Sequence, residues 1–473
     1  MPGPIAQTFA AQRPQLAGDL WGGLAAMLVA LPSAIAFGVA IFAPFGGAQA
    51  AQGALAGILG ATALGLVAPL FGGTTRLVTA PCAPAAAVLS ALVLGFAQKG
   101  MPAEAAVLLV GLIGLLAGTV QIGLGMAGIG RLIRYIPYPV VSGYLSGVGL
   151  IIIGSQVPKL LGAAADMKLP DALLSPSAWH WPSLVVGGIV MAAMVLMPRL
   201  TQVVPAAILA LLAGVAAYLA LGLVDPTLLR TTGNPYLIGS LADGGANLDG
   251  TISRYWQALR GLDPTDVAQV LVPAVTLAVL LSIDTLKTCL VLDAMTDSHH
   301  EPNRELVGQG LGNMAAAMVG GVPGAGTMGA SLVNIASGGT TRASGFAAGL
   351  FSLAAFLLLT PVIAWVPVAA LAAILIVVGL RMIDRHSLSF FFSRATRLDF
   401  LVIVSVILAA LAINLIAASG VGVALAILLF IREQTRSSVV RNRIEGREVF
   451  SKRVRTGEDP EAMERSAADT VIL

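Results

Sequence analysis

Two stretches that interrupt long apolar segments with glycine and proline constrain this chain more than any other feature. The first is Thr79–Pro84, read Thr-Ala-Pro-Cys-Ala-Pro, and the second is Val322–Ser331, read Val-Pro-Gly-Ala-Gly-Thr-Met-Gly-Ala-Ser. Each opens the backbone at the depth of a lipid bilayer and then starts a new helical pattern. Lipid offers no hydrogen-bond partners, so an open backbone survives there only where it lines a cavity. Broken spans at matching places in two halves of a chain indicate a transporter's substrate site.

The composition places most of the chain in a membrane. Hydrophobic residues make up 57% of the chain and charged residues only 11%, which excludes an ordinary soluble domain. The apolar runs predict an all-α, multi-pass membrane protein with about fourteen spans. We expect these spans at about 22–42, 51–71, 84–98, 103–125, 138–157, 182–197, 203–223, 267–293, 305–320, 327–338, 343–360, 363–380, 399–418 and 420–432.

The distribution of positive charge orients these spans. With a cytoplasmic N-terminus, the inside segments hold 20 of the 27 lysines and arginines, the outside holds six, and Lys287 lies within a span. This bias predicts a protein of the plasma (inner) membrane with both termini in the cytoplasm. Cytoplasmic loops also account for the basic pI, so no nucleic-acid partner is expected. Cys82 and Cys289 both fall inside spans, which argues against a disulfide framework, and no zinc-ligand spacing occurs.

The longest polar stretch divides the chain into two halves. Residues 224–266 form the predicted outer connection between a first repeat, 1–223, and a second repeat, 267–433, and residues 434–473 form a cytoplasmic tail. Seven spans per half place the second half in the membrane from the opposite face, which is the arrangement of an inverted repeat. The broken third span then corresponds to the broken tenth.

Each break leads into a short helix whose start should lie near the middle of the membrane. Residues 327–338 would form a helix of about 18 Å, well short of the roughly 30 Å hydrocarbon core. Pro84 suits the first turn of the other short helix, where a missing N–H costs nothing. Each helix start carries free N–H groups and about half a positive charge, so two facing starts would form a site for a small anion.

The eighth span contains two opposite charges one helical turn apart. Asp284, Lys287 and Thr288 stand at i, i+3 and i+4 and share one helix face. One interpretation is a structural ion pair. In the other, Asp284 is the coupling carboxylate that binds Na⁺ or carries a proton, Thr288 adds an oxygen ligand, and Lys287 is a fixed cation facing the anion or occupying the place of a coupling cation. The sequence leaves these roles open.

Other polar residues of the spans carry weaker signals. Ser33 and Phe37 follow the helix break at Pro32 and could form a polar and an aromatic wall of the cavity. Three asparagines are predicted to be interhelical hydrogen-bond partners rather than ligands, namely Asn313, Asn334 and Asn414. The four histidines fall in predicted loops, and no third ligand is spaced to complete a metal site with His299 and His300.

Three segments carry a family resemblance: Leu31–Phe37, Ser282–Gly310 and Pro323–Arg342. The most specific run is Asn303–Gly310, read Asn-Arg-Glu-Leu-Val-Gly-Gln-Gly. Together these segments resemble the SulP, or sulfate permease, family over about residues 15–450. The resemblance implies fourteen spans in a 7+7 inverted repeat, with a mobile core (spans 1–4 and 8–11) and a gate (spans 5–7 and 12–14). It also implies elevator-like secondary transport of a small anion, in a homodimer within the lipid bilayer.

The resemblance also implies the site. The family's substrate and coupling positions fall on Ser33, Phe37, Cys82, Ala83, Asp284, Thr288, Gly329, Ala330 and Ser331. Ala330 stands at the position where prestin-like members of the family look to carry an arginine that helps to hold the anion. Lys287 stands where bicarbonate-transporting relatives look to have an apolar residue. We infer that positive charge has moved from the tenth span to the eighth, which adds Lys287 to the substrate site. Cys82 stands where those relatives have a threonine.

The leading functional interpretation is a secondary active transporter of bicarbonate, sulfate or a small dicarboxylate, not an enzyme. No cofactor is expected beyond Na⁺ or H⁺ as the coupling ion, with Asp284 and Thr288 as the candidate Na⁺ ligands. An anion exchanger with Lys287 as its fixed counter-charge is an alternative. A nucleobase permease of the same architecture is the nearest rival, but it should carry carboxylates in both the eighth and tenth spans, and the tenth has none.

Two other classes fit less well. A voltage-sensing channel would need a row of arginines along one helix, and the sequence has none. An intramembrane enzyme would need a nucleophile beside a base, and neither Cys82 nor Cys289 has a histidine in its span. Relatives usually continue into a soluble STAS domain. The ending Val471–Leu473 resembles the first strand of such a domain, so we expect a shortened or STAS-less chain with a poorly ordered tail.

Overall fold

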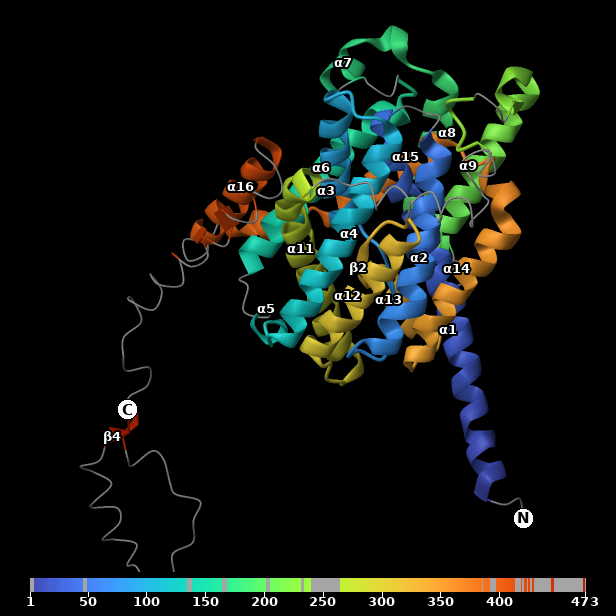
Figure 1. Cartoon of the computed structure of the whole chain (residues 1–473). Helices are drawn as coiled ribbons and strands as arrows, with labels where there is room; N and C mark the ends of the chain where they lie inside the picture. Colours follow the sequence, from blue (N-terminus) through green and yellow to red (C-terminus); the bar gives the residue numbers. More distant parts are fainter. Residues whose placement is uncertain are drawn as a thin grey trace, which may run out of the picture.

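A computed structural model shows a helical bundle whose helices coincide with the predicted spans (Figure 1). The structure describes residues 4–45, 49–133, 138–163, 167, 169–200, 205–230, 234–239, 264–384, 386–391, 397–412, 418, 421–422, 424–425 and 428, and the short strands 444–445 and 471–472. Most of the predicted fourteenth span, most of the 224–266 connection and most of the 434–473 tail lie outside these residues.

Helices occupy the other thirteen predicted spans. They are α1 (Pro4–Phe42), α2 (Ala50–Phe71), α3 (Ala83–Gln98), α4 (Ala103–Met126), α6 (Tyr138–Leu160), α8 (Trp181–Leu200), α9 (Ala206–Val224), α11 (Pro264–Thr296), α12 (Pro302–Met318), α13 (Met328–Ala336), α14 (Arg342–Ile363), α15 (Val368–Met382) and α16 (Arg397–Ala412). Among the described helices, eight are long and apolar enough to cross a membrane by themselves. The others include the short α3 and α13, as the breaks predict.

Several boundaries differ from the prediction, and α1 starts at Pro4, well before the predicted residue 22. The twelfth span starts at Val368 rather than 363, because α14 continues to Ile363 and Pro367 precedes the next helix as its N-cap. The tenth span is also shorter than predicted. Helix α13 has nine residues, which is about 14 Å, with Thr327 at its N-cap position and Ser337 at its C-cap position.

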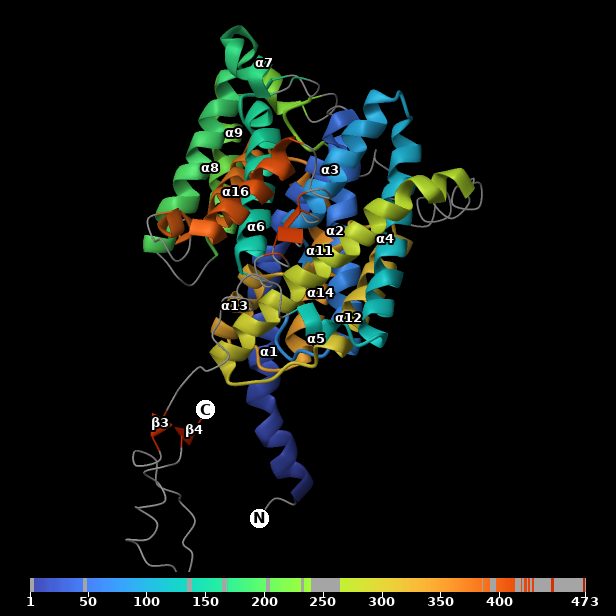
Figure 2. The ribbon, with the colours of Figure 1, turned by 90° about the vertical axis from the view of Figure 1, so that its left-hand side faces the viewer.

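The helices pack in two groups that match the expected core and gate. Helices α1, α2, α4, α11, α12 and α14 pack chiefly on one another and on α3 and α13, whereas α6, α8, α9, α15 and α16 form the second group. In Figure 2, α6, α8 and α9 lie on the left and α2, α4 and α12 on the right. Fewer contacts join the groups, chiefly from α1 to α15 and from α3 to α6.

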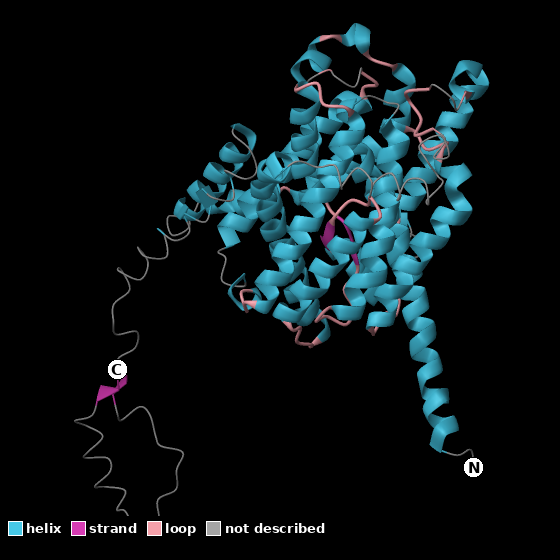
Figure 3. Cartoon of the chain, in the orientation of Figure 1, coloured by secondary structure: helices cyan, strands magenta, loops and turns pink. Residues whose placement is uncertain are grey.

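The two breaks cross each other in the middle of the bundle. Strand β1 (Thr79–Pro81) pairs antiparallel with β2 (Gly324–Gly326), and Ala80 lies opposite Ala325. Figure 3 shows this pair enclosed by helices. All six strand residues are buried. This pairing satisfies backbone groups that lipid would leave without hydrogen-bond partners. The predicted all-α fold therefore also contains one small antiparallel sheet inside the bundle.

Small residues allow the core helices to approach closely. A Cβ on Gly38 of α1 would lie 1.9 Å from the carbonyl oxygen of Gly53 in α2, and a Cβ on Gly53 would lie 2.5 Å from the Gly38 oxygen. Both distances are shorter than any real contact. Glycine at this crossing therefore sets the spacing of the two helices by packing, as in many membrane bundles.

Two further elements complete the description. At the end of the gate where the short helix α7 (Leu169–Leu174) lies, the rings of His180 and Tyr236 stack at 3.8 Å with a 7° interplanar angle. In the tail, β3 (Ile444–Glu445) pairs antiparallel with β4 (Val471–Ile472). The ending that resembles a strand in the sequence is therefore a strand in the structure.

Candidate functional site

The crossing strands place two helix starts at the centre of the core. Helix α3 begins at Ala83 with Pro84 in its first turn, and Cys82 is its N-cap in an extended conformation. Helix α13 begins at Met328 after Thr327. Neither helix has an acidic residue in its first turn or a side chain that caps its N–H groups. The free N–H groups and helix dipoles therefore make the region of the two starts positive.

Polar side chains of neighbouring helices hold the second break in place. Asn313 of α12 donates to the carbonyl oxygen of Gly324 at 3.0 Å and accepts from its N–H at 2.8 Å. The N–H of Gly326 donates to Thr285 of α11 at 3.0 Å. Asn313 also donates to Gln121 of α4 at 2.8 Å, which confirms its predicted role between helices.

The eighth-span charges form a pair within α11. The Lys287 ammonium lies 3.6 Å from the Asp284 carboxylate, and their side chains are 31% and 17% exposed. Thr288 is buried and donates to the backbone carbonyl oxygen of Asp284 at 3.0 Å. Both charges lie close enough to act on the Cys82 thiol at the start of α3. The structure thus joins the predicted coupling residues to the first break.

The other predicted site residues take different positions. Cys82 and Ala83 are buried at the start of α3. Ser331 is fully buried, and its hydroxyl accepts a hydrogen bond from the N–H of Val78 at 2.9 Å, beside β1. Ala330 is buried beside it, whereas a Cβ on Gly329 would meet no atom within 4 Å, so open space lies there.

Ser33 and Phe37, the two predicted site residues of the first span, lie in different surroundings. Ser33 is half-buried, and its hydroxyl donates to the carbonyl oxygen of Val29 at 3.4 Å, within the same helix. Phe37 lines a cavity of about 490 Å³ between α1, α3 and α6. The predicted role of Phe37 and Ser33 as walls of the substrate site stays a prediction.

Sequence reasoning missed a contribution from the gate. Tyr144 of α6 is 7% exposed, and its buried hydroxyl has no hydrogen-bond partner among the described residues. This hydroxyl lies within electrostatic range of Cys82 and Asp284. A tyrosine in the middle of an apolar span, away from the interfaces where tyrosines collect, was the available signal.

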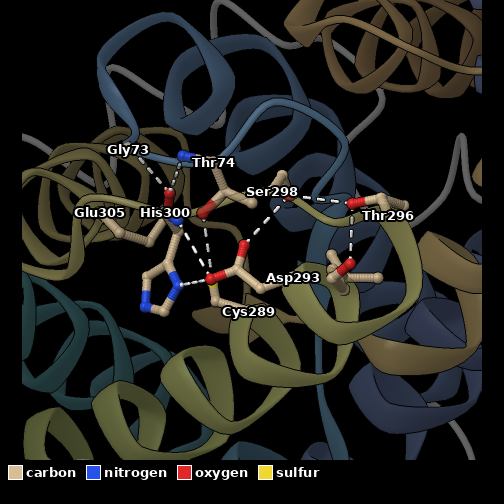
Figure 4. Close-up of polar contacts among 9 residues, drawn as sticks. Gly73, Thr74, Cys289, Asp293, Thr296, Ser298, His300 and Glu305 are labelled. Carbon is tan, nitrogen blue, oxygen red and sulfur yellow. Dashed lines mark hydrogen bonds and ion pairs between the residues drawn. The ribbon is translucent and has the colours of Figure 1, made fainter. Parts of the chain in front are cut away.

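The specific run Asn303–Gly310 holds the segment that precedes the first break, and Figure 4 shows Glu305 of this run beside Gly73 and Thr74. Glu305 is 2% exposed, and its carboxylate accepts the N–H groups of Gly73 and Thr74 at 2.8 and 2.9 Å. Gln309 donates to Glu305 at 2.9 Å and to the Thr79 hydroxyl, in β1, at 2.8 Å. The run therefore fixes the segment that leads into the first break.

The same close-up shows how the end of α11 is tied to this segment (Figure 4). The Thr74 hydroxyl and the Cys289 thiol lie 3.2 Å apart, and Asp293 contacts the His300 ring nitrogen Nδ1 at 2.6 Å. Cys289 is thus a packing partner rather than part of a disulfide. His300 is engaged by Asp293.

The segment Pro323–Arg342, the third that carries the family resemblance, makes contacts that hold the loop between α13 and α14. Asp19 of α1 accepts the N–H groups of Thr340 and Thr341 at 2.7 and 3.0 Å and also the Thr341 hydroxyl. Asn334 of α13 donates to Ser344 of α14 at 2.8 Å, which confirms its predicted role between helices. Asn414 lies outside the described residues. These contacts anchor both ends of the loop between α13 and α14.

Known proteins are similar to this chain in sequence. The chain is 32% identical over 430 residues to the bicarbonate transporter BicA of Picosynechococcus sp., covering 88% of this chain and 70% of that protein. It is 27% identical over 342 residues to the chloroplastic sulfate transporter 4.1 of Arabidopsis thaliana, covering 70% of this chain and 47% of that protein.

Solved structures agree. The transmembrane domain of a cyanobacterial BicA superposes with a TM-score of 0.70 at 29% identity, covering 85% of this chain and 97% of that domain. The murine solute carrier 26 family member A9 gives the same TM-score at 17% identity, covering 89% of this chain and 68% of that one, and so supports the fold alone. The fold is thus the 7+7 inverted repeat. Because the Sulfate permease family profile matches residues 16–406, the chain belongs to this family of multi-pass membrane anion transporters.

Proposed function

We propose that this protein is a secondary active transporter of bicarbonate, with the anion bound between the starts of α3 and α13. The observation that carries the proposal is the crossing of β1 and β2, which brings two uncapped helix starts together inside the core. Similarity to BicA favours bicarbonate, and similarity to a plant sulfate transporter makes sulfate the second anion to test.

Electrostatics favour an anion at this place. Each helix start contributes about half a positive charge, and the uncapped N–H groups offer hydrogen bonds that a small oxyanion can accept. Open space at Gly329 leaves room for it. Lys287 supplies a full positive charge on the adjacent helix, so the local sum of charge favours an anion even with Asp284 ionised.

Asp284 is the proposed coupling residue. A carboxylate on an intramembrane helix is costly and marks ion or proton pathways. Thr288 stands one turn further along the same face, where its hydroxyl can add an oxygen to Na⁺. Coupling requires that the contact of 3.6 Å between Lys287 and Asp284 opens when the cation or proton arrives.

The same contact supports a second candidate function. If the Lys287–Asp284 pair persists through the cycle, no carboxylate is left for a cation, and the protein exchanges one anion for another. Lys287 then serves as the fixed counter-charge of the anion.

We further propose an elevator-like movement of the core against the gate, in a homodimer in the plasma membrane with both termini in the cytoplasm. The movement is supported by the packing, since most helix contacts fall within the two groups rather than between them. The dimer and the orientation follow from the resemblance and from the charge distribution.

Transport in proteoliposomes tests the proposal. Purified protein is reconstituted, and uptake of radiolabelled bicarbonate and sulfate is measured with inward Na⁺, inward H⁺ or no cation gradient, and with or without a trapped internal anion. Gradient-driven uptake that is lost in Asp284→Asn and kept in the exposed control Lys99→Gln supports cation coupling. Uptake that requires internal anion and survives Asp284→Asn supports exchange. Absence of uptake of either anion by wild-type protein would refute the proposed function.

A further inference from the structure

A cavity of about 490 Å³ separates the core from the gate on one side of the molecule. Most of the length of α3, on the core, and the second half of α6, on the gate, form its facing walls, and Leu169 of α7 contributes from above. Most of its lining is apolar, for example Ala87, Leu94 and Ile152. Its polar lining residues are Ser90, Gln98, Ser155, Gln156 and Lys159.

The cavity extends from near the start of α3 towards one face of the protein. At its inner end it is lined by Phe37 and by Ala86, which lies one turn after the start of α3. Its other end lies towards α7, at the end of the bundle opposite the start of α1 (Figures 1 and 2). The charge distribution of the sequence predicts that this end faces outward. A solute entering here comes within one turn of the start of α3, beside the predicted site.

Lys159 carries the only charge among the described residues that line this cavity. Its side chain is half-buried, and it forms no salt bridge or hydrogen bond within the described part of the chain. It lies in the last turn of α6, where the helix dipole stabilises an ammonium group without neutralising it. Burial lowers the pKa of Lys159 to about 7, so an anion that enters the cavity favours the charged ammonium form, which then acts on that anion.

An unpaired charge between low-dielectric walls has a strong effect on small ions. Apolar walls focus the field along the cavity, so a single ammonium raises the local concentration of anions and lowers that of cations. Gln156, one turn before Lys159, donates one amide N–H to the Ser155 hydroxyl and keeps a second N–H that an oxyanion can use, whereas the Ser155 hydroxyl itself donates to Ile152. Neither is charged, so the preference for anions rests on the lysine.

We propose that this cavity is the outer vestibule of the transport pathway and that Lys159 is its anion-selecting residue. The ligand is the small oxyanion of the proposed function, on which this inference rests. Because the core and the gate supply opposite walls, the vestibule exists only while the core is in its present position against the gate. Lys159 acts before binding at the α3 and α13 helix starts, so it affects capture of the anion and not the turnover of the bound site.

Kinetics separate capture from turnover. In Lys159→Gln we expect the KM for bicarbonate uptake to rise about tenfold while kcat changes less than twofold, because the charge raises anion concentration at the entrance. Lys159→Arg should keep the wild-type KM, and Lys99→Gln, an exposed lysine beyond the cavity, serves as the matched control. The difference between Lys159→Gln and wild type should shrink at high ionic strength, where charge is screened. An unchanged KM in Lys159→Gln would overturn the role of Lys159.

A second experiment is independent of transport. Lys159→Cys is treated in intact cells with membrane-impermeant methanethiosulfonates, whose reaction with the thiolate forms a mixed disulfide and releases methanesulfinate. The two described cysteines of the wild type are buried, so the unmodified wild type is the background control. We expect external labelling of Lys159→Cys, and no labelling would overturn the vestibule even if anion uptake is normal.

Chemical rescue completes the test. Attaching a trimethylammonium group at Lys159→Cys should restore the wild-type KM, whereas attaching a sulfonate of similar size should leave it high. Equal effects of the two groups would show that size rather than charge matters and would refute anion selection. If wild-type protein takes up neither anion while external labelling succeeds, the proposed function fails and the accessible cavity stands.

Discussion

Glu305 offers the sharpest test of how the first break is held. Its carboxylate is buried and receives three hydrogen bonds, two from the N–H groups of Gly73 and Thr74 and one from Gln309. Glu305→Ala leaves two buried N–H groups without partners. Each orphaned donor costs about 1–3 kcal/mol, so we expect a loss of about 4 kcal/mol before any effect of the cavity.

Glu305→Gln should cost much less for a specific reason. The Gly73 and Thr74 N–H groups both bind the same carboxylate oxygen, Oε2, which the amide oxygen of glutamine can replace. The glutamine amide nitrogen would then face Gln309, whose own Oε1 has no partner in the described structure. If the Gln309 amide rotates by about 180°, its Oε1 takes the place of its Nε2 and accepts from the new glutamine amide. The Thr79 hydroxyl, which accepts from Gln309 in the wild type, can then donate to the same Oε1. Loss of the charge-assisted bonds leaves a cost of about 1–2 kcal/mol.

Thermal unfolding of the purified protein in detergent, followed by intrinsic fluorescence, measures both variants. We expect the melting temperature to fall at least twice as far for Glu305→Ala as for Glu305→Gln, with anion uptake retained by Glu305→Gln. Equal destabilisation by the two substitutions would refute the hydrogen-bond account. Wild-type stability of Glu305→Gln combined with complete loss of uptake would show that the charge serves transport rather than structure.

Two further predictions concern the gate. Tyr144→Phe removes a buried hydroxyl that has no partner in the described structure, so the free energy of unfolding should stay the same or rise by about 1 kcal/mol. The KM of anion uptake should increase severalfold, because this hydroxyl lies near Cys82 and Asp284 of the candidate site. Lower stability with an unchanged KM would contradict this prediction. Burial lowers the pKa of His180 below its usual value of about 6.5. The fold therefore favours neutral His180, and its contribution to stability is fully present above about pH 6.5 and is lost as the pH falls towards the lowered pKa. His180→Gln should flatten the dependence of the melting temperature on pH between about 5 and 7, and a slope equal to wild type would rule this out.

The span positions follow from the sequence because the bilayer imposes them. A continuous run of apolar residues can satisfy its backbone in lipid only as a helix, so hydropathy places helices even without tertiary information. The breaks at Thr79–Pro84 and Val322–Ser331 were detectable for the same reason. Local chemistry also placed the first turn of α3 at Pro84 correctly.

The pairing of the two breaks as antiparallel strands was decided by the tertiary structure. The β1–β2 pair joins Ala80 to Ala325, and the Ser331 hydroxyl meets Val78 across a separation of 253 residues. No local pattern encodes such pairing, since it depends on how α12 and α11 pack and on which side chains, such as Asn313, reach the strands. The boundary at Val368 was missed because hydropathy does not distinguish the end of one apolar helix from the start of the next.

The sequence by itself determined that the chain crosses a membrane many times, breaks two spans at bilayer depth and carries Asp284 and Lys287 on one helix face, since each property depends on residues that are neighbours along the chain. The tertiary structure alone decided that the breaks cross as strands, that Glu305 caps the approach to the first break, and that Tyr144 and Lys159 of the gate face the core. The reason is that hydrogen bonds and cavities between distant segments arise from packing, and packing is set by the whole bundle and not by any one of its helices.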